Sequence, residues 1–549
     1  MPLDLVSIAA VQAEGLGSPL KGRDVRIRGV VTGSTRKGFF VQDPHETDPE
    51  VACALFVYTR RRPPPRDTWV ELEGRVDDYV AIPGDRPVTQ LRLKNTTERY
   101  DAVPALQPVW LDADWLDHSN ADLARRLARL QGRLVGIPSG SMFSAPSNLF
   151  GDYVVLPPGL VSLRTGQGGM RIDPERPLRW LPGFRLRARG APRVDVGSKL
   201  LDPVIGPLNY RAQSYQIVAL QTPKIELVSQ SATACQLHSD AQHMSVLTLN
   251  GFNLDAQIED PNLVNDPRRD VDDDVGDGRF EMLARDVVEQ AGAPDVIALQ
   301  EIQDDDGAEL TDVVTADATY RVLVDAIARH GGPAYAWVDQ PPETDADGGQ
   351  PGGNIRNGYL YRTDRVEVVP GTVRRLGEGH RAFEDSRKAL WAHFRLRTTG
   401  KEVAMVNVHL ASKRHQHSIF APESPELDPR EPTRVAQAQH IREALLAHEG
   451  PVYVTGDFND HEFSETLRTL CGAQFTNLVE SLPPEDRHDY NHRGTGQALM
   501  HGVVRTAMAQ RGHATYEVLH GNQLVGAEPG VRGTRASDHA YVLALLRLG

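Results

Sequence analysis

The chain has 549 residues, a length that favours several domains over one. Its hydrophobic content of 40% is typical of soluble cores, and no apolar run is long enough to span a bilayer. The net charge of −14 is uneven, because residues 1–240 hold 30 Lys and Arg against 26 Asp and Glu, whereas residues 241–549 hold 30 against 48. An acidic half that binds a phosphate substrate needs metal ions or basic patches to screen it, although the same charge also serves solubility.

The cysteines and the first residues bear on two further classes of protein. Cys53, Cys235 and Cys471 lie far apart without a CxxC pair, so we expect neither a zinc site nor a disulfide framework. The first residues lack a basic segment followed by an apolar one, so we expect no secretory signal in this chain.

Residues 1–105 are predicted to form a small OB-like β-barrel. Runs of β-favouring residues between Gly- and Pro-rich turns predict five strands, at residues 25–31, 38–43, 54–58, 69–76 and 89–93.

A basic loop lies within this barrel and contains Arg60, Arg61 and Arg62. Cationic residues together with the nearby rings of Phe39 and Phe40 are typical of a groove for single-stranded nucleic acid. The alternative is that the arginines are ordinary surface residues and both phenylalanines belong to the core.

Residues 106–225 are predicted to form a second OB-like, β-rich domain. An apolar stripe of Leu123, Leu127 and Leu130 predicts a helix over residues 121–130. Strands are expected at residues 132–137, 153–156, 184–188 and 215–220. Residues 226–242 are polar and irregular, which indicates a linker.

Residues 243–549 alternate between strand and helix patterns, which predicts an α/β domain. Strands are expected at residues 246–250, 296–301, 358–361, 389–394, 403–410 and 452–459, with a last strand after residue 539. Helices are expected over residues 279–290, 311–330 and 432–448. The strand at 452–459 begins with a short, mostly apolar run and ends in Gly-Asp-Phe-Asn, as in a parallel strand that is buried on both faces.

Polar side chains recur at the ends of these apolar strands. They are Asn250, Glu301, Asn407, His409, Asp457, Asn459, Asp538 and His539. Ligands in α/β sheets usually bind outside the carboxyl ends of the strands, so we expect the set to converge there. Carboxylate and amide oxygens suit Mg²⁺ or Mn²⁺ rather than zinc.

The order of these motifs resembles the DNase-I-like endonuclease/exonuclease/phosphatase superfamily. The matching segments are Leu249-Asn250, Leu299-Gln-Glu301, Asn357-Gly-Tyr-Leu-Tyr-Arg362, Asn407-Val-His409, Gly456-Asp-Phe-Asn459 and Ser537-Asp-His539. The resemblance implies a four-layer α/β sandwich over residues 243–549. The N-terminal part, through segments such as Gly38-Phe-Phe-Val-Gln-Asp-Pro44, resembles the region before this domain in bacterial extracellular nucleases.

The resemblance also implies roles for the strand-end residues. Asn250, Glu301 and Asp538 would bind the metal ion, Asp457 would deprotonate the attacking water and Asn459 would orient it. His409 and His539 would contact the scissile phosphate or assist the leaving oxygen. Asn407, with Arg60, Arg61 and Arg62, would contact the nucleic acid.

One departure from the family concerns the support of His539. The family usually has an acidic residue that orients this closing histidine. Met500 stands in the matching place, within Gly496-Gln-Ala-Leu-Met-His-Gly502. Either another acid such as Asp489 replaces it, or the activity is weakened or redirected.

An acidic segment suggests a further ion. Asp270, Asp272 and Asp274, with Glu281 further on, have the spacing of an EF-hand loop and make Ca²⁺ a further candidate cofactor. Val275 stands where that loop needs glycine, and the alternative is a solvated acidic loop before a helix.

The leading hypothesis is a metal-dependent nuclease that hydrolyses phosphodiester bonds of DNA, or of RNA, with low sequence specificity. Two OB-like domains favour a polymer substrate, and we expect a monomer without a membrane partner. One alternative is a phosphatase or phosphodiesterase acting on small phosphoesters. Another is a nucleic-acid-binding protein with a weakened nuclease domain. An extracellular or periplasmic setting is implied only by the resemblance.

Overall fold

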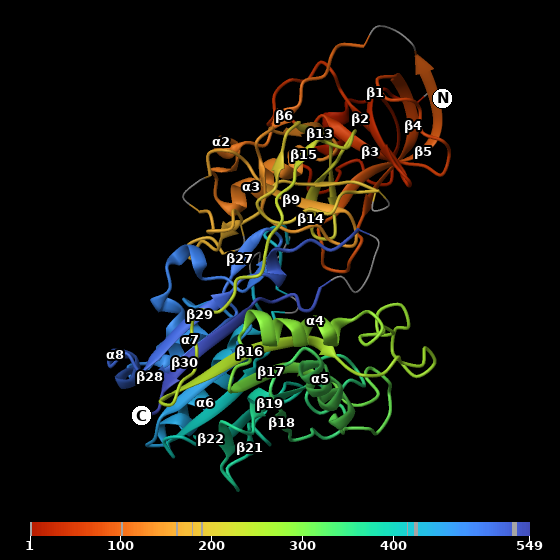
Figure 1. Cartoon of the computed structure of the whole chain (residues 1–549). Helices are drawn as coiled ribbons and strands as arrows, with labels where there is room; N and C mark the ends of the chain where they lie inside the picture. The colour runs from red at the N-terminus through yellow and green to blue at the C-terminus, as the bar shows by residue number, and fades with distance from the viewer. Residues whose placement is uncertain are drawn as a thin grey trace.

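The computed structural model describes residues 3–99, 103–160, 163–177, 179–187, 190–413, 416–421, 427–529 and 535–549. Two β-rich N-terminal units lie at one end of the molecule, and the layered C-terminal part lies at the other (Figure 1). All three cysteines are free. None of the described helices is long and apolar enough to cross a membrane.

The first unit is a closed five-stranded barrel with the strand order β1-β2-β3-β5-β4. Its strands are β1 (Asp24–Thr35), β2 (Gly38–Gln42), β3 (Ala54–Tyr58), β4 (Trp69–Tyr79) and β5 (Val88–Arg99), and α1 (Ile8–Gln12) precedes them. Alternating apolar side chains such as Ile27 and Leu72 fill its interior. The barrel predicted for this region is therefore confirmed.

Phe39 and Phe40 have no exposed surface, and Phe39 packs in the barrel core. Neither ring is available to stack on nucleic-acid bases, because β2 is buried along its whole length. The alternative interpretation of these rings, as core residues, is the correct one.

The second unit is one nine-stranded sheet, with the order β15-β12-β8-β9-β11-β14-β13-β7-β6, in place of a second closed barrel. Its strands are β6 (Val109–Trp110), β7 (Leu134–Ile137), β8 (Met142–Phe143), β9 (Asp152–Leu156), β11 (Gly183–Arg185), β12 (Lys199–Leu200), β13 (Val204–Arg211), β14 (Ser214–Val218) and β15 (Ile225–Glu226). Helices α2 (Ala113–Leu116) and α3 (Asn120–Arg129) precede most of the sheet. Leu123 and Leu127 of α3 are buried in the core, as the apolar stripe predicts.

The C-terminal part contains two mixed sheets. The first has the order β18 (Tyr335–Val338), β19 (Arg356–Arg362), β17 (Val296–Ile302), β16 (His243–Leu254), β30 (Tyr541–Arg547) and β29 (Ala514–Leu519). The second has the order β20 (Val366–Val368), β22 (Ala389–Leu396), β23 (Glu402–His409), β24 (Val452–Asp457), β28 (Met500–Arg505) and β25 (Phe475–Asn477), with β21 (Arg374–Leu376) paired to β22.

The two sheets pack face to face, and helices cover their outer faces. Val246 and Tyr359 of the first sheet share a core with Met405 and Tyr453 of the second. The first sheet is covered by α4 (Arg279–Arg285), a π-helical turn (Asp286–Gln290) and α5 (Asp317–Arg329), and the second by α6 (Glu431–Leu446) and α7 (Glu465–Cys471). The short α8 (Thr506–Gln510) follows β28. This is the expected four-layer α/β sandwich.

A small three-stranded sheet links the second unit to the sandwich. It has the order β10 (Met170–Arg171), β27 (Thr495–Gln497) and β26 (Tyr490–His492). Strand β10 belongs by sequence to the second unit, whereas β26 and β27 form a hairpin just before β28 of the sandwich.

Candidate active site

The first sheet supplies Asn250 and Glu301 from two adjacent parallel strands, Asn250 from within β16 and Glu301 from near the end of β17. The register of β16 with β17 shifts after Asn250, and Glu301 has a φ of +55°. This local irregularity lets the Glu301 side chain turn toward its neighbour rather than continue the alternation of the strand. Glu301 Oε1 accepts a hydrogen bond from Asn250 Nδ2 at 3.1 Å, and Oε2 accepts one from Asn253 N at 3.1 Å.

The second sheet supplies His409 and Asp457, which are paired across the parallel strands β23 and β24. Gly456 has a φ of +137°, and a Cβ there would lie 1.9 Å from Val408 O, so only glycine fits between the strands. His409 Nε2 lies 3.6 Å from Asp457 Oδ2 and also 3.6 Å from Glu301 Oε1. The two sheets therefore meet at one polar cluster.

This cluster has the composition of a divalent metal site. Glu301, His409 and Asp457 each offer a ligand atom within 4.8 Å of the others. Burial raises the pKa of Glu301, and the charges of Asp538 and Asp457 raise it further. Burial also raises the pKa of Asp457. A bound cation would relieve this repulsion, so the residues fit the Mg²⁺ or Mn²⁺ that the sequence predicts.

Asn459 is part of the turn that follows Asp457. It has a φ of +51°, which asparagine tolerates better than most residues. Its backbone N donates to Asp457 Oδ1 at 2.8 Å, and its Nδ2 donates to Leu410 O at 3.2 Å. Asn459 thereby fixes the orientation of the Asp457 carboxylate and leaves Asp457 Oδ2 facing the imidazoles.

His539 completes the cluster and has an acidic partner. Its Nε2 lies 3.9 Å from Asp457 Oδ2, and its Nδ1 lies 3.0 Å from Asp489 Oδ1. Burial lowers the pKa of His539, but the hydrogen bond with Asp489 and the charges of Asp538 and Asp457 outweigh burial and raise the pKa to about 10. The ring of Tyr490 lies against the imidazole, with 4.7 Å between ring centroids.

Asp489, and not residue 500, is therefore the acid that supports His539. Its second oxygen accepts hydrogen bonds from Leu499 N at 2.8 Å and Met500 N at 3.0 Å. The Met500 side chain is fully buried in the core between the sheets. Of the two alternatives that the sequence left open, the structure supports replacement of the usual acid by Asp489.

Arg387 is a site residue that the sequence analysis missed. It lies just before β22, is 6% exposed, and donates from Nη2 to Leu410 O at 2.9 Å. Its buried Nε has no hydrogen-bond partner among the described residues. Burial, followed by the charges of Arg387 and His539, holds the pKa of His409 well below its usual value. The sequence offers no signal beyond an arginine two residues before the strand expected at residues 389–394, because burial is visible only in the structure.

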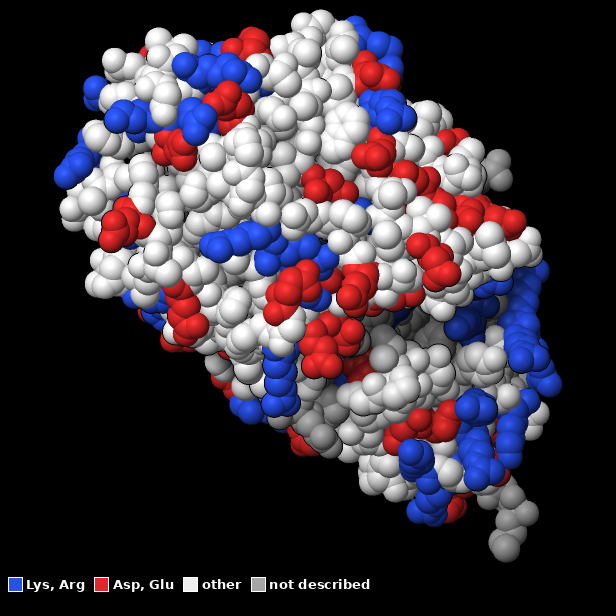
Figure 2. Space-filling model, turned by 90° about the horizontal axis from the view of Figure 1, so that it is seen from below, with Lys and Arg blue, Asp and Glu red and all other residues white. Residues whose placement is uncertain are grey.

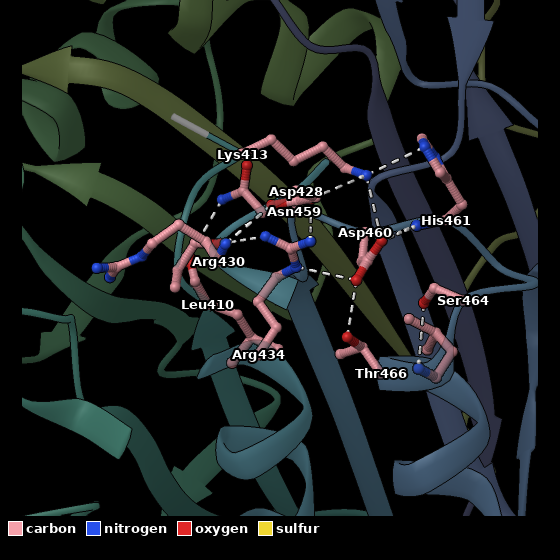
Figure 3. Close-up of polar contacts among 12 residues, drawn as sticks. Leu410, Lys413, Asp428, Arg430, Arg434, Asn459, Asp460, His461, Ser464 and Thr466 are labelled. Atoms are coloured by element: carbon pink, nitrogen blue, oxygen red, sulfur yellow. Dashed lines mark hydrogen bonds and ion pairs between the residues drawn. The ribbon is translucent and has the colours of Figure 1, made fainter. Parts of the chain in front are cut away.

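A buried ionic network lies beside the cluster, around Asp460 (Figure 3). The fully buried Arg434 of α6 donates from Nε to Asp460 Oδ2 at 2.9 Å and also pairs with Asp428. Lys413 Nζ lies 3.2 Å from Asp460 Oδ1, and Thr466 donates to Asp460 Oδ2 at 2.7 Å. The network anchors the chain directly after the Asp457–Asn459 turn.

Asn407 is buried between the two sheets and not exposed to a substrate. It is fully buried, and its Nδ2 donates to Leu299 O at 2.8 Å and to Gly358 O at 2.9 Å. Its Oδ1 accepts a hydrogen bond from Gln300 Nε2 at 2.6 Å. The prediction that Asn407 contacts nucleic acid is therefore wrong, because its amide joins the two sheets instead.

The predicted calcium ligands do not converge. Asp272 and Asp274 lie near Asp255, with ligand atoms within 4.8 Å of one another. Glu281 instead forms an ion pair with an arginine of α5, and Asp270 accepts a hydrogen bond from Asp266 N at 2.8 Å. The EF-type set is thus corrected to a smaller acidic cluster, because Glu281 faces the neighbouring helix.

The surface of the molecule is mixed in charge. In the view from below, several acidic side chains gather near the middle of the face, and basic side chains are spread over the face, with several along the right margin (Figure 2). Arg60, Arg61 and Arg62 are exposed on the barrel, which Figure 1 shows at the end of the molecule away from the two sheets.

The fold and the site together define a phosphoester hydrolase of the four-layer α/β type. The sequence profile of the Endonuclease/Exonuclease/phosphatase family matches residues 260–539, just over half of the chain. The chain belongs to this family and is a metal-dependent hydrolase of phosphoesters.

Several solved structures are similar to part of this chain. A humanized zebrafish TDP2 is 15% identical and matches over 56% of this chain and 99% of its own, with a TM-score of 0.35. An endonuclease/exonuclease/phosphatase from Bacteroides vulgatus is 16% identical over 56% and 99%, with a TM-score of 0.32. The human Nocturnin catalytic domain is 14% identical over 56% and 94%, with a TM-score of 0.36. No curated protein is significantly similar to this chain in sequence.

Proposed function

We propose that the protein is a metal-dependent nuclease that hydrolyses phosphodiester bonds of DNA, or of RNA, with low sequence specificity. The observation that carries the proposal is the approach of two imidazoles, those of His409 and His539, to Asp457 Oδ2, at 3.6 Å and 3.9 Å. One carboxylate oxygen between two histidines can take a proton from a water while the imidazoles face the phosphate.

The side chains differ in protonation state, so that His539 can act as an acid and Asp457 as a base. His539 keeps a proton because Asp489 pairs with its Nδ1, so its Nε2 can donate to a phosphoryl or leaving oxygen. Burial keeps His409 neutral, and Asp457, held by Asn459 N, acts as the base for the attacking water. Groups whose environments separate their pKa values in this way suit paired acid and base roles.

Asn250, Glu301 and Asp538 would hold the metal ion, with His409 and Asp457 within reach of it. When bound, a divalent cation neutralises phosphoryl charge and lowers the pKa of a bound water. Arg387 adds a fixed positive charge beside Glu301 and Asp457, and its buried Nε is available for an anionic oxygen.

A polymer substrate is favoured by the two N-terminal units and by the exposed Arg60, Arg61 and Arg62. A chain of phosphates can contact a basic loop far from the scissile bond, whereas a small phosphoester cannot. A phosphatase acting on small phosphoesters is the second candidate, since all the residues around Asp457 would serve it equally.

One assay distinguishes these functions. Purified protein is incubated with Mg²⁺, Mn²⁺ or chelator, and with plasmid DNA, single-stranded DNA, RNA or a small phosphate monoester. We expect metal-dependent cleavage of at least one polymer. Hydrolysis of the monoester alone would contradict the nuclease proposal, and binding of DNA without cleavage of any substrate would indicate a silent catalytic domain.

A further inference from the structure

The second N-terminal unit shares a sheet with the hairpin that leads to the catalytic centre. Strand β10 pairs in parallel with β27, so that Met170 lies opposite Thr495. Ile172 N extends the ladder by donating to Gly496 O at 2.9 Å. Main-chain hydrogen bonds of this kind fix the register of the hairpin relative to the second unit.

Side chains lock the tip of the same hairpin against the second unit. Asn491 Nδ2 donates to Ser144 O at 2.8 Å, and Ser144 Oγ donates to Gly494 O. Gly494 has a φ of +91°, and a Cβ there would lie 2.7 Å from Val154 Cγ1. The hairpin tip therefore packs against the second unit without free space.

The β26–β27 hairpin contacts His539 through its first residues. It begins at Asp489, whose N donates to Gln497 O at 2.9 Å across the hairpin. Asp489 Oδ1 lies 3.0 Å from His539 Nδ1, and the ring of Tyr490 packs on the same imidazole. Next to Asp489, His488 Nε2 lies 2.9 Å from Gln167 Oε1 of the second unit.

A second segment of the sandwich is held by the same unit. Val196 N donates to Leu524 O at 3.0 Å, and Gly526 N donates to Asp195 Oδ1 at 2.8 Å. Ser147 Oγ donates to Ala527 O at 2.8 Å. The second unit therefore binds two segments that lie between Asp489 and His539 in the chain, the hairpin after Asp489 and the residues 524–527.

We propose that the second unit is a positioning element of the catalytic centre, in which Ser144 and Asn491 hold the β26–β27 hairpin and thereby set the orientation of His539. The inference rests on the catalytic role proposed for His539. Because a displacement of about 1 Å in a catalytic group can cost about a hundredfold in rate, a hairpin anchored from another unit is enough to control turnover.

The first test compares interface variants in the full-length chain. We expect Ser144→Ala combined with Asn491→Ala to lower kcat by about tenfold, with KM changed less than about twofold, because the variants misplace His539 without touching the substrate. Gln167→Ala removes only the side-chain contact with His488 and should also lower kcat. This variant replaces the double variant as the test if the double variant does not fold. An unchanged kcat in folded variants would overturn the proposal.

A matched control uses another hydrogen bond between the second unit and the sandwich. Ser418 Oγ donates to Gln213 O at 3.1 Å. Arg493 in the turn of the hairpin donates to the same oxygen at 3.4 Å, and Ser418→Ala leaves that contact in place. Ser418→Ala should leave kcat unchanged. A loss of kcat equal to that of the hairpin variants would show a general effect of the interface and would overturn the proposal.

A double-mutant cycle separates positioning from general destabilisation. In an Asp489→Asn background, the hairpin variants should lower kcat by less than about twofold more, because the path to His539 is already broken. Equal fold losses in both backgrounds would overturn the proposal. The Nδ1 proton resonance of ¹⁵N-labelled His539 gives a readout independent of activity, and it should shift in the hairpin variants and not in Ser418→Ala. If the unmodified protein cleaves nothing, the proposed function fails, while this resonance still tests the positioning.

Discussion

His539 and Asp489 form a pair in which the imidazole Nδ1 lies 3.0 Å from the carboxylate Oδ1. The carboxylate directly precedes the β26–β27 hairpin, and the imidazole precedes β30, the last strand of the chain, which belongs to the first sheet of the sandwich. Leu499 N and Met500 N bind the second oxygen of Asp489, so the carboxylate has a single orientation. A carboxylate held in this way fixes both the tautomer and the angle of the imidazole.

The first prediction concerns this pair. Asp489→Asn should lower kcat by about 10- to 100-fold, because an amide cannot stabilise the charged imidazole of His539. Met500→Leu is the matched control, since it keeps the apolar volume of a buried core residue and should leave kcat within about twofold. Steady-state kinetics of both variants checks this. Normal turnover in Asp489→Asn would remove Asp489 from the mechanism.

The second prediction concerns the two groups that would exchange protons with the substrate. Asp457→Asn and His539→Ala should each reduce hydrolysis by at least about 100-fold, since positioned proton transfer contributes rate factors of this size. Circular dichroism and thermal unfolding should show an intact fold. Near-normal turnover in both folded variants would contradict the assignment of the centre.

The third prediction concerns the metal ion and the stability of the site. A chelator should abolish hydrolysis, and Mg²⁺ or Mn²⁺ should restore it. Burial and the charges of Asp538 and Asp457 raise the pKa of Glu301, so Glu301→Gln should raise the free energy of unfolding when the metal is removed. The same variant should lose the increase in Tm that metal binding gives the unmodified protein. Chemical and thermal unfolding with and without metal measures both effects. An equal metal-induced rise in Tm for the two proteins would exclude Glu301 as a ligand.

The fourth prediction concerns the pH dependence of stability around Asp460 (Figure 3). Burial acts to raise the pKa of Asp460, but the charges of Lys413 and Arg434 outweigh it, so that the pKa lies well below its usual value. A carboxylate whose pKa is lowered by folding stabilises the folded state at pH values above its unfolded-state pKa of 3.8. This contribution is lost as the pH falls from 3.8 toward the lower pKa of the folded state. Asp460→Asn should therefore cost about 3 kcal/mol at pH 7, because the fully buried Arg434 then keeps only one of its two carboxylate partners, Asp428.

The difference in unfolding free energy between Asp460→Asn and the unmodified protein should become smaller as the pH falls from about 5 to about 3. Denaturant unfolding across this range measures it. A difference that stays constant below pH 4 would show that the carboxylate charge of Asp460 does not stabilise the fold.

Strand-end residues were predictable from the sequence wherever a local pattern sets the geometry. The apolar run before Asp457 forces a buried strand, and the parallel register of β23 with β24 then pairs Asp457 with His409. The same reasoning located Glu301 at the end of β17. The alternation of these strands with helices predicted an α/β domain. The four layers of the sandwich were implied by the family resemblance.

Contacts between distant segments were not predictable in this way. Asn407 lies in the second sheet, and its burial depends on the first sheet, whose Leu299 O and Gly358 O accept hydrogen bonds from its amide. Glu281 has the right spacing for a calcium loop but lies on a helix that faces α5. The sequence named Asp489 only as one candidate for the acid that supports His539, because the contact depends on a hairpin that another unit anchors.

The last prediction concerns the exposed arginines of the barrel. Replacing Arg60, Arg61 and Arg62 by glutamine should weaken binding of single-stranded DNA, because each charge that neutralises a phosphate releases a counterion. If all three contact phosphates, the slope of log K against log salt should become shallower by about 2. Replacing the same three residues by lysine keeps the charge and should keep the slope. Fluorescence anisotropy at several salt concentrations, with chelator present to prevent cleavage, measures both variants. An unchanged slope in the glutamine variant would show that the barrel does not bind the nucleic acid through this loop, and that substrate recognition lies elsewhere on the chain.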